Sequence, residues 1–203
     1  MKHVQRSLLA AVVGSAALVS TACGPKDTGA ADAAGAAKTT TAVATPAEPT
    51  TADGHTSPGM RLKIGERAVV PANYNEQRFG TVAITVTAIE PGDASDLERF
   101  PAEQVTGVTP VRIRFTVEFV KGDDLSGLPM TLVGRQADGS RTGIGLAGES
   151  TACDSKNAGD DFTTPGAKFE SCSLAGSKDG LKVETAAFND GGDYRKNPIL
   201  WGN

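Results

Sequence analysis

The chain has 203 residues, of which 39% are apolar and only 5% aromatic, and it carries a formal net charge of −4 with a sequence pI near 5.2. Its length accommodates one domain with tails, since a domain takes about 150 residues. The acidic balance argues against a nucleic-acid-binding surface, because such surfaces present basic patches and a high pI. We therefore expect no nucleic-acid partner.

The N-terminal segment, residues 1–22, has the features of a secretory signal. Lys2 and Arg6 provide a positively charged start. The uncharged stretch that follows, residues 7–22, is shorter than the ~20 residues that a membrane-spanning helix needs. It ends in the small residues Ser-Thr-Ala at positions 20–22, as a cleavage site requires. This pattern predicts export from the cytoplasm.

Cys23 follows the expected cleavage site directly. Residues 19–23 resemble the lipobox of bacterial lipoproteins, and this resemblance implies a diacylglyceryl group on the Cys23 thiol and Cys23 as the mature N-terminus. Ser20 departs from the pattern, because leucine is favoured three places before the cysteine. Cleavage of the same bond by an ordinary signal peptidase is the alternative, since Ser-x-Ala also fits its small-residue rule. A lipid on Cys23 would anchor the protein to the outer face of the bacterial cell membrane.

The cysteine count also fits lipidation, because the chain has three cysteines and an odd number in an exported protein needs an explanation. With Cys23 lipidated, Cys153 and Cys172 remain as a pair that is free to oxidise outside the cytoplasm. Their disulfide would stabilise the fold by roughly 3 kcal/mol in the chain-entropy model. Two buried free thiols are the alternative.

Residues 23–59 are expected to form the lipidated cysteine and a disordered tether. Of the 36 residues from Gly24 to Gly59, 27 are Ala, Thr, Gly or Pro, and Val43 is the only bulky apolar side chain. Such a segment buries too little surface to offset the entropy lost on ordering. As a flexible coil it would span on the order of 30–35 Å and hold a domain away from the membrane. A tail without a selected length is the alternative.

From residue 60 to residue 203 the pattern changes to short strands. Two segments, Thr81–Glu90 and Pro110–Val120, alternate apolar and polar side chains as half-buried antiparallel strands do. Further strands are expected at residues 62–64, 68–70, 168–174 and 181–188, with a hairpin over residues 130–146 around Asp138-Gly139 and a short helix within residues 94–100. About seven strands predict an all-β fold, a two-sheet antiparallel β-sandwich, with a closed barrel as the alternative.

Three of these segments, Leu62–Glu66, Thr81–Glu90 and Val111–Phe119, resemble an immunoglobulin-like domain of exported Gram-positive lipoproteins, especially those of actinobacteria. The class is similar to a secreted mycobacterial antigen of immunoglobulin-like fold, and the cysteine pair and the closing Pro198–Trp201 fit it as well. The resemblance covers residues 60–203 and implies an immunoglobulin-like sandwich outside the cytoplasm, with no general enzymatic activity. It departs from antibody domains because no tryptophan lies between the two cysteines.

Residues 60–203 offer little chemistry. They contain no histidine, which excludes Ser-His-Asp and Cys-His catalysis and histidine-based zinc sites there. The motifs of serine hydrolases, phosphate-binding loops and Cys-x-x-Cys redox pairs are also missing. We therefore expect no enzyme, no catalytic residue, no cofactor and no metal.

The leading hypothesis is a lipid-anchored protein whose domain contacts a protein or cell-wall partner. The second is an envelope protein that binds a small ligand or calcium, because flexible loops carry oxygen ligands of the kind that calcium prefers. These loop carboxylates, which could equally be solvated surface acids, are Asp154, Asp160, Asp161, Asp190 and Asp193.

Two other groups have alternative interpretations. Arg112 and Arg114 share one strand face, which is either a ligand-contact stripe or, as we expect, a solvent face balanced by acids on neighbouring strands. Tyr74, Phe79 and Trp201 are either exposed binding aromatics or, as we expect, core side chains at the ends of the sandwich.

Overall fold

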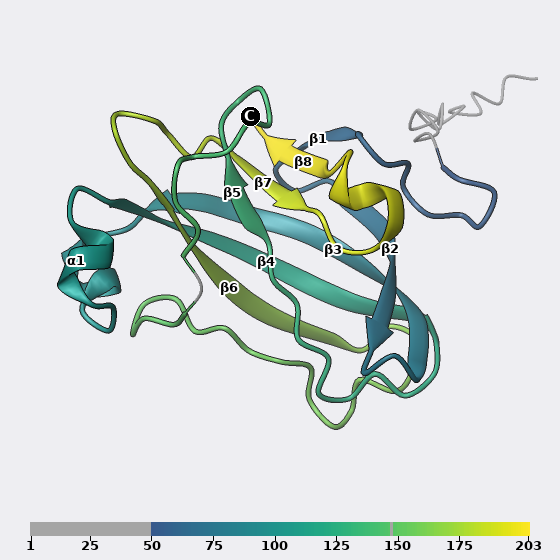
Figure 1. Ribbon diagram of the computed structural model, residues 1–203. Helices are drawn as coiled ribbons and strands as arrows, with labels where there is room; N and C mark the ends of the chain where they lie inside the picture. Colours follow the sequence, from purple (N-terminus) through teal and green to yellow (C-terminus); the bar gives the residue numbers. More distant parts are fainter. Residues whose placement is uncertain (1–49, 147) are drawn as a thin grey trace, which may run out of the picture. The chain divides into compact units, whose positions relative to one another are not determined.

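Eight strands in two four-stranded sheets make up the part of the chain that the computed structural model describes, residues 50–146 and 148–203 (Figure 1). The signal segment, Cys23 and the expected tether up to residue 49 lie outside these described residues. The prediction of an all-β sandwich is confirmed. In the described part of the chain, none of the helices has the length and apolar character needed to cross a bilayer.

The larger sheet has the order β2-β3-β4-β6 and is antiparallel throughout. Its strands are β2 (Arg67–Tyr74), β3 (Arg78–Pro91), β4 (Thr109–Gly122) and β6 (Lys168–Ser177). The long β3 and β4 contain the two alternating segments of the sequence. Their β-branched and aromatic side chains, such as Ile84 and Phe115, are almost fully buried because every second side chain faces the core.

The smaller sheet has the order β1-β8-β7-β5. Its strands are β1 (Arg61–Lys63), β8 (Ile199–Gly202), β7 (Thr185–Phe188) and β5 (Val133–Arg135). The sequence analysis expects an antiparallel sandwich, but the pair β1–β8 is parallel. Strand β8 was not expected, because a four-residue run after Pro198 is too short to show a periodic pattern.

Aromatic side chains fill the space between the sheets. Phe119 and Phe162 meet edge to face with ring centroids 5.6 Å apart, and Phe162 contacts Phe169 in the same way at 5.1 Å. Trp201 is fully buried, and its indole N–H donates to the Glu66 carbonyl at 2.9 Å. The expectation that Trp201 belongs to the core is therefore confirmed.

The expected hairpin over residues 130–146 is wrong. Gln136 N–H donates to the Ser140 carbonyl at 3.0 Å, so the turn exists, but β5 pairs with β7 instead of with residues 141–146. Those residues form no strand, and Gly143 adopts a φ of 83°, which is outside the extended region. Alternation identifies a strand, but the partner strand depends on the rest of the sheet.

The helical residues between β3 and β4 are divided into two pieces. A 3₁₀ turn spans Ala94–Leu97 and a single α-helical turn, α1, spans Ala102–Val105. A second 3₁₀ turn, η2, spans Gly192–Arg195 before β8. The 3₁₀ turn is therefore shorter than the helix expected within residues 94–100, and residues 98–101 separate it from α1.

The folded unit includes residues 50–59, which were expected to belong to the tether. Thr56 is buried, its N–H donates to the Val69 carbonyl at 2.7 Å, and its hydroxyl accepts from the Val69 N–H at 2.9 Å. The Tyr194 hydroxyl donates to the Thr56 carbonyl at 2.8 Å. Polar contacts, rather than burial of large apolar side chains, attach this segment, and composition does not reveal such contacts.

Replacing Tyr194 by phenylalanine should lower the free energy of unfolding by about 1 kcal/mol, because the buried Thr56 carbonyl would lose its donor. The same change should speed hydrogen exchange at the amides of residues 51–56 more than in β4. Hydrogen exchange followed by mass spectrometry measures both effects, and equal acceleration in β4 would show that the hydroxyl does not hold the segment specifically.

Candidate functional site

The expected disulfide is present, since Cys153 and Cys172 are bonded, with their Cα atoms 5.1 Å apart. Both cysteines are buried. Cys172 lies in β6 and Cys153 in the preceding loop, so the bond attaches a loop to the larger sheet and does not connect the two sheets. The proposed lipidation residue, Cys23, lies outside the described residues and stays a prediction.

A buried ionic cluster lies beside the disulfide. Asp96 is fully buried and contacts the Arg112 guanidinium at 2.7 Å. Arg112 also contacts the exposed Asp93 at 2.8 Å, and the Ser150 hydroxyl donates to the Asp96 carboxylate. Ser150 in turn exchanges backbone hydrogen bonds with Cys153 at 3.1 and 3.2 Å. The cluster therefore joins the β3–β4 connection, β4 and the disulfide loop.

The pKa of Asp96 is lowered although burial by itself would raise it. The hydrogen bonds from Arg112 and Ser150 and from the Asp93 N–H stabilise the ionised carboxylate by more than burial destabilises it. The same contacts raise the pKa of Arg112, mainly through the hydrogen bond to Asp96. Both groups therefore stay charged at neutral pH. We call the cluster of Asp93, Asp96, Arg112 and Ser150 the ionic clasp.

The sequence contained part of the signal for this cluster. Asp93 and Asp96 are three residues apart, and the structure shows the reciprocal side-chain to backbone bonds of a capping box. Their contacts with Arg112 and Ser150 arise from tertiary structure and have no local signature. Only 14% of the Arg112 side chain is exposed, so Arg112 is more buried than the solvent-face position that the sequence analysis expects.

Two further acids on the outer face of the larger sheet, Glu90 and Glu118, are balanced by cations on neighbouring strands, as expected. Arg114 on β4 contacts Glu90 on β3 at 3.0 Å. Glu118 on β4 contacts Arg67 on β2 at 3.2 Å and Lys168 on β6 at 2.9 Å. These pairs are partly exposed, so each contributes little to stability.

The loop carboxylates do not form a metal site in the described residues. Over residues 50–146 and 148–203, no group of three or more His, Cys, Asp and Glu side chains is placed to hold a metal ion. Asp154 contacts Lys156 at 3.7 Å, and Asp160 and Asp161 are exposed. Asp190 and Asp193 line a groove that also includes residues from β2 and β3.

Residues 60–203 contain no histidine, but the folded unit also includes His55. Its ring Nε2 lies 3.2 Å from the Thr81 hydroxyl oxygen. Among the side-chain hydrogen bonds of the described residues, none joins this ring to a carboxylate, so a Ser-His-Asp arrangement is not formed around it.

The remaining aromatic residues differ in exposure. Tyr74 is half-buried, with the Arg78 guanidinium 4.3 Å from its ring centroid. Phe79 has 54% of its surface exposed, which contradicts the expected core position. Among the described residues, Phe79 and Leu181 are the two large apolar side chains that are exposed, and Phe79 is the more exposed of the two.

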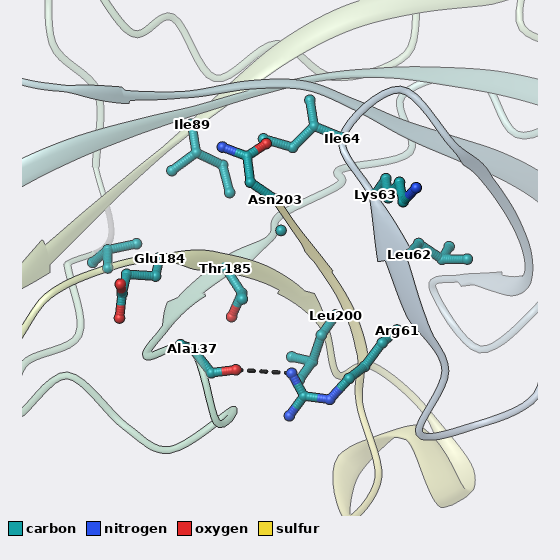
Figure 2. Close-up of a pocket in the computed structure, with 12 residues that line it drawn as sticks. Arg61, Leu62, Lys63, Ile64, Ile89, Ala137, Glu184, Thr185, Leu200 and Asn203 are labelled. Carbon is teal, nitrogen blue, oxygen red and sulfur yellow. Dashed lines mark hydrogen bonds between the residues drawn. The ribbon is translucent and has the colours of Figure 1, made fainter.

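One groove of about 500 Å³ lies over the outer face of the smaller sheet (Figure 2). Arg61 from β1 reaches across Leu200 of β8 and donates to the carbonyls of Ala137 and Asp138 at 2.8 and 3.0 Å. Arg61 therefore fastens the turn after β5 to the sheet. Lys63 and Glu184 lie on opposite sides of the groove in Figure 2.

A second groove, of about 680 Å³, lies beside the edge strand β2. Three segments form it: residues 51–58, residues 71–80 of the β2–β3 hairpin, and residues 190–195. It contains the exposed Phe79, the ring of His55 and several acidic side chains. This groove combines apolar surface, charge and a strand edge, and we take it as the candidate binding site.

No family model matches the chain, and no curated protein matches it. Among solved structures, the chain is similar to MPT63, a secreted protein from Mycobacterium tuberculosis, with 17% sequence identity and a TM-score of 0.46. The match covers 71% of this chain and 97% of that one.

Proposed function

We propose that this chain is a lipid-anchored protein outside the cytoplasm that presents an immunoglobulin-like β-sandwich for non-catalytic binding to a protein or an envelope component. The observation that carries the proposal is the position of Cys23, directly after an uncharged signal stretch and small residues, in a chain whose first sandwich strand begins at Arg61. A lipid on the Cys23 thiol would attach the mature protein to the outer face of the membrane.

The segment between anchor and domain supports this arrangement. Residues 24–49 make 26 positions, and as a flexible coil this length would span about 25–30 Å. The domain would therefore stand away from the lipid headgroups with its surfaces accessible. The disulfide at Cys153 and Cys172 also fits an oxidising environment outside the cytoplasm.

Lipidation is tested by replacing Cys23 with serine. Cells fed a clickable fatty acid should label the wild-type protein, and Cys23→Ser should lose the label and leave the membrane fraction, because serine has no thiol to alkylate. A Cys153→Ser variant is the matched control and should keep its label. Equal labelling of the Cys23→Ser variant and the wild type would show that the lipid is not on Cys23.

A further inference from the structure

The groove beside β2 contains an open strand edge. Strand β2 lies at the edge of the larger sheet, with β3 as its neighbour on one side (Figure 1). Val69 of β2 bonds with Thr56 through both its N–H and its carbonyl. Hydrogen-bonding directions alternate along an antiparallel strand, so the Pro71 carbonyl and both backbone groups of Asn73 point to the same outer side.

No strand of the described residues pairs with this edge beyond Thr56. Proline at position 71 removes one donor, which limits unwanted strand pairing. The edge therefore offers the Pro71 carbonyl, the Asn73 N–H and the Asn73 carbonyl, enough for a short extended peptide.

The groove is acidic. Asp53, Glu76, Asp190 and Asp193 line it, against the single guanidinium of Arg195. In the described part of the chain, none of these four carboxylates takes part in a salt bridge, whereas Glu90 and Glu118 on the outer face of the larger sheet do. The unbalanced charge favours a cationic occupant.

Phe79 is held in place at this groove. Its N–H donates to the Asp123 carboxylate at 2.8 Å, and its carbonyl accepts from the Asp123 N–H at 2.9 Å. A side chain at Gly122, whose φ is 130°, would collide with the neighbouring Gly80 backbone, so the two strands approach closely here. Phe79 is thus exposed on a constrained backbone, and its ring can stack on the stem and charge of a lysine or arginine.

From these observations we propose that the groove binds an extended peptide segment rich in lysine or arginine, contributed by a partner protein. The peptide backbone pairs with β2 at Pro71 and Asn73, one cationic side chain lies over Phe79, and others face the carboxylates of Asp190 and Asp193. The proposal adds the chemistry of the partner to the proposed function. It rests on that function in one respect, namely that the domain is a binding module.

The test uses the full mature chain and a fluorescent heptapeptide in which lysine alternates with threonine. Anisotropy in 50 mM salt should show binding that weakens as salt rises, since exposed carboxylates are screened. A peptide with glutamate in place of lysine should not bind. A lysine peptide with alternating N-methylated amides should bind at least several-fold more weakly, because strand pairing needs those N–H donors.

Protein variants test the groove itself. Phe79→Ala should weaken binding about threefold or more, and combined Asp190→Asn and Asp193→Asn should weaken it about fivefold. Asp160→Asn with Asp161→Asn is the matched control, because it removes the same charge from exposed residues outside the groove. The peptide should also slow hydrogen exchange at the Asn73 amide.

Several results would overturn the proposal: no binding at millimolar peptide, equal binding of the glutamate peptide, or an equal loss in the control variant. A dimer of the free chain that Phe79→Ala dissociates would assign the groove to a second copy of this chain instead. Fatty-acid labelling at Cys23 does not depend on any of these measurements, so failure of the groove and failure of the anchor are distinguishable.

Discussion

Replacing Asp96 by alanine should lower the free energy of unfolding at pH 7 by about 3 kcal/mol, because it leaves the largely buried Arg112 with only the exposed Asp93 as a partner. It also removes the acceptor of the Ser150 hydroxyl. Urea denaturation of the full mature chain measures the difference. Asp93→Ala is the matched control and should have a much smaller effect, since 64% of its side chain is exposed.

The pH dependence of this difference follows from the lowered pKa of Asp96. A carboxylate whose pKa is lower in the folded state stabilises the fold fully above its unfolded pKa, near 3.8, and loses this effect as the pH falls through its folded pKa. The gap between wild type and Asp96→Ala should therefore be constant from pH 5 to pH 8 and should shrink below about pH 4. A gap that persists at pH 2.5 would show that the carboxylate charge is not its source.

Removing the disulfide should have an effect of similar size. Changing Cys153 and Cys172 together to alanine should lower the free energy of unfolding by roughly 3 kcal/mol, because the reduced chain gains entropy when unfolded. For a domain of this size that corresponds to a fall in Tm of about 6–12 °C. Calorimetry of the variant, and of the wild type with and without reductant, measures it. Cys153 and Cys172 found as free thiols in exported protein would contradict the pairing.

The disulfide and the ionic clasp meet at Ser150, so their effects should not be independent. Cys153 donates its N–H to the Ser150 hydroxyl oxygen at 3.0 Å, and that hydroxyl donates to Asp96. Loss of either the bond or the carboxylate releases the same loop. The triple variant should therefore be less destabilised than the sum of the two separate effects, as is usual for residues that share a contact.

Phe79 and His55 show where the sequence patterns gave the wrong location. Phe79 lies in a strand, and the sequence analysis expects it in the core. However, the first three residues of β3 are not buried, and the Phe79 side chain is exposed. His55 was assigned to a tether of small residues, whereas hydrogen bonds from Thr56 and Tyr194 place it in the folded unit. The contacts of residues 55 and 56 have no local signature in the sequence, because their partners Val69, Thr81 and Tyr194 are distant in the chain.

By itself the sequence determined the class of fold and the two longest strands. In β3 and β4 the alternation of apolar and polar residues is local, and a strand with one buried face must show it. The sequence also predicted the pairing of Cys153 with Cys172, on the expectation that Cys23 carries a lipid, and the structure contains this bond. The tether composition and the signal pattern are likewise local properties.

Tertiary structure decided everything that depends on which strands become neighbours. It paired β5 with β7 and β1 with β8, where three or four residues carry too little pattern to specify a partner. It placed Arg112 against Asp96 and Ser150, and it left the outer edge of β2 open beside four unpaired carboxylates of the described chain. Long-range contacts of this kind arise only when the sheets are assembled, so no periodicity in the sequence reveals them.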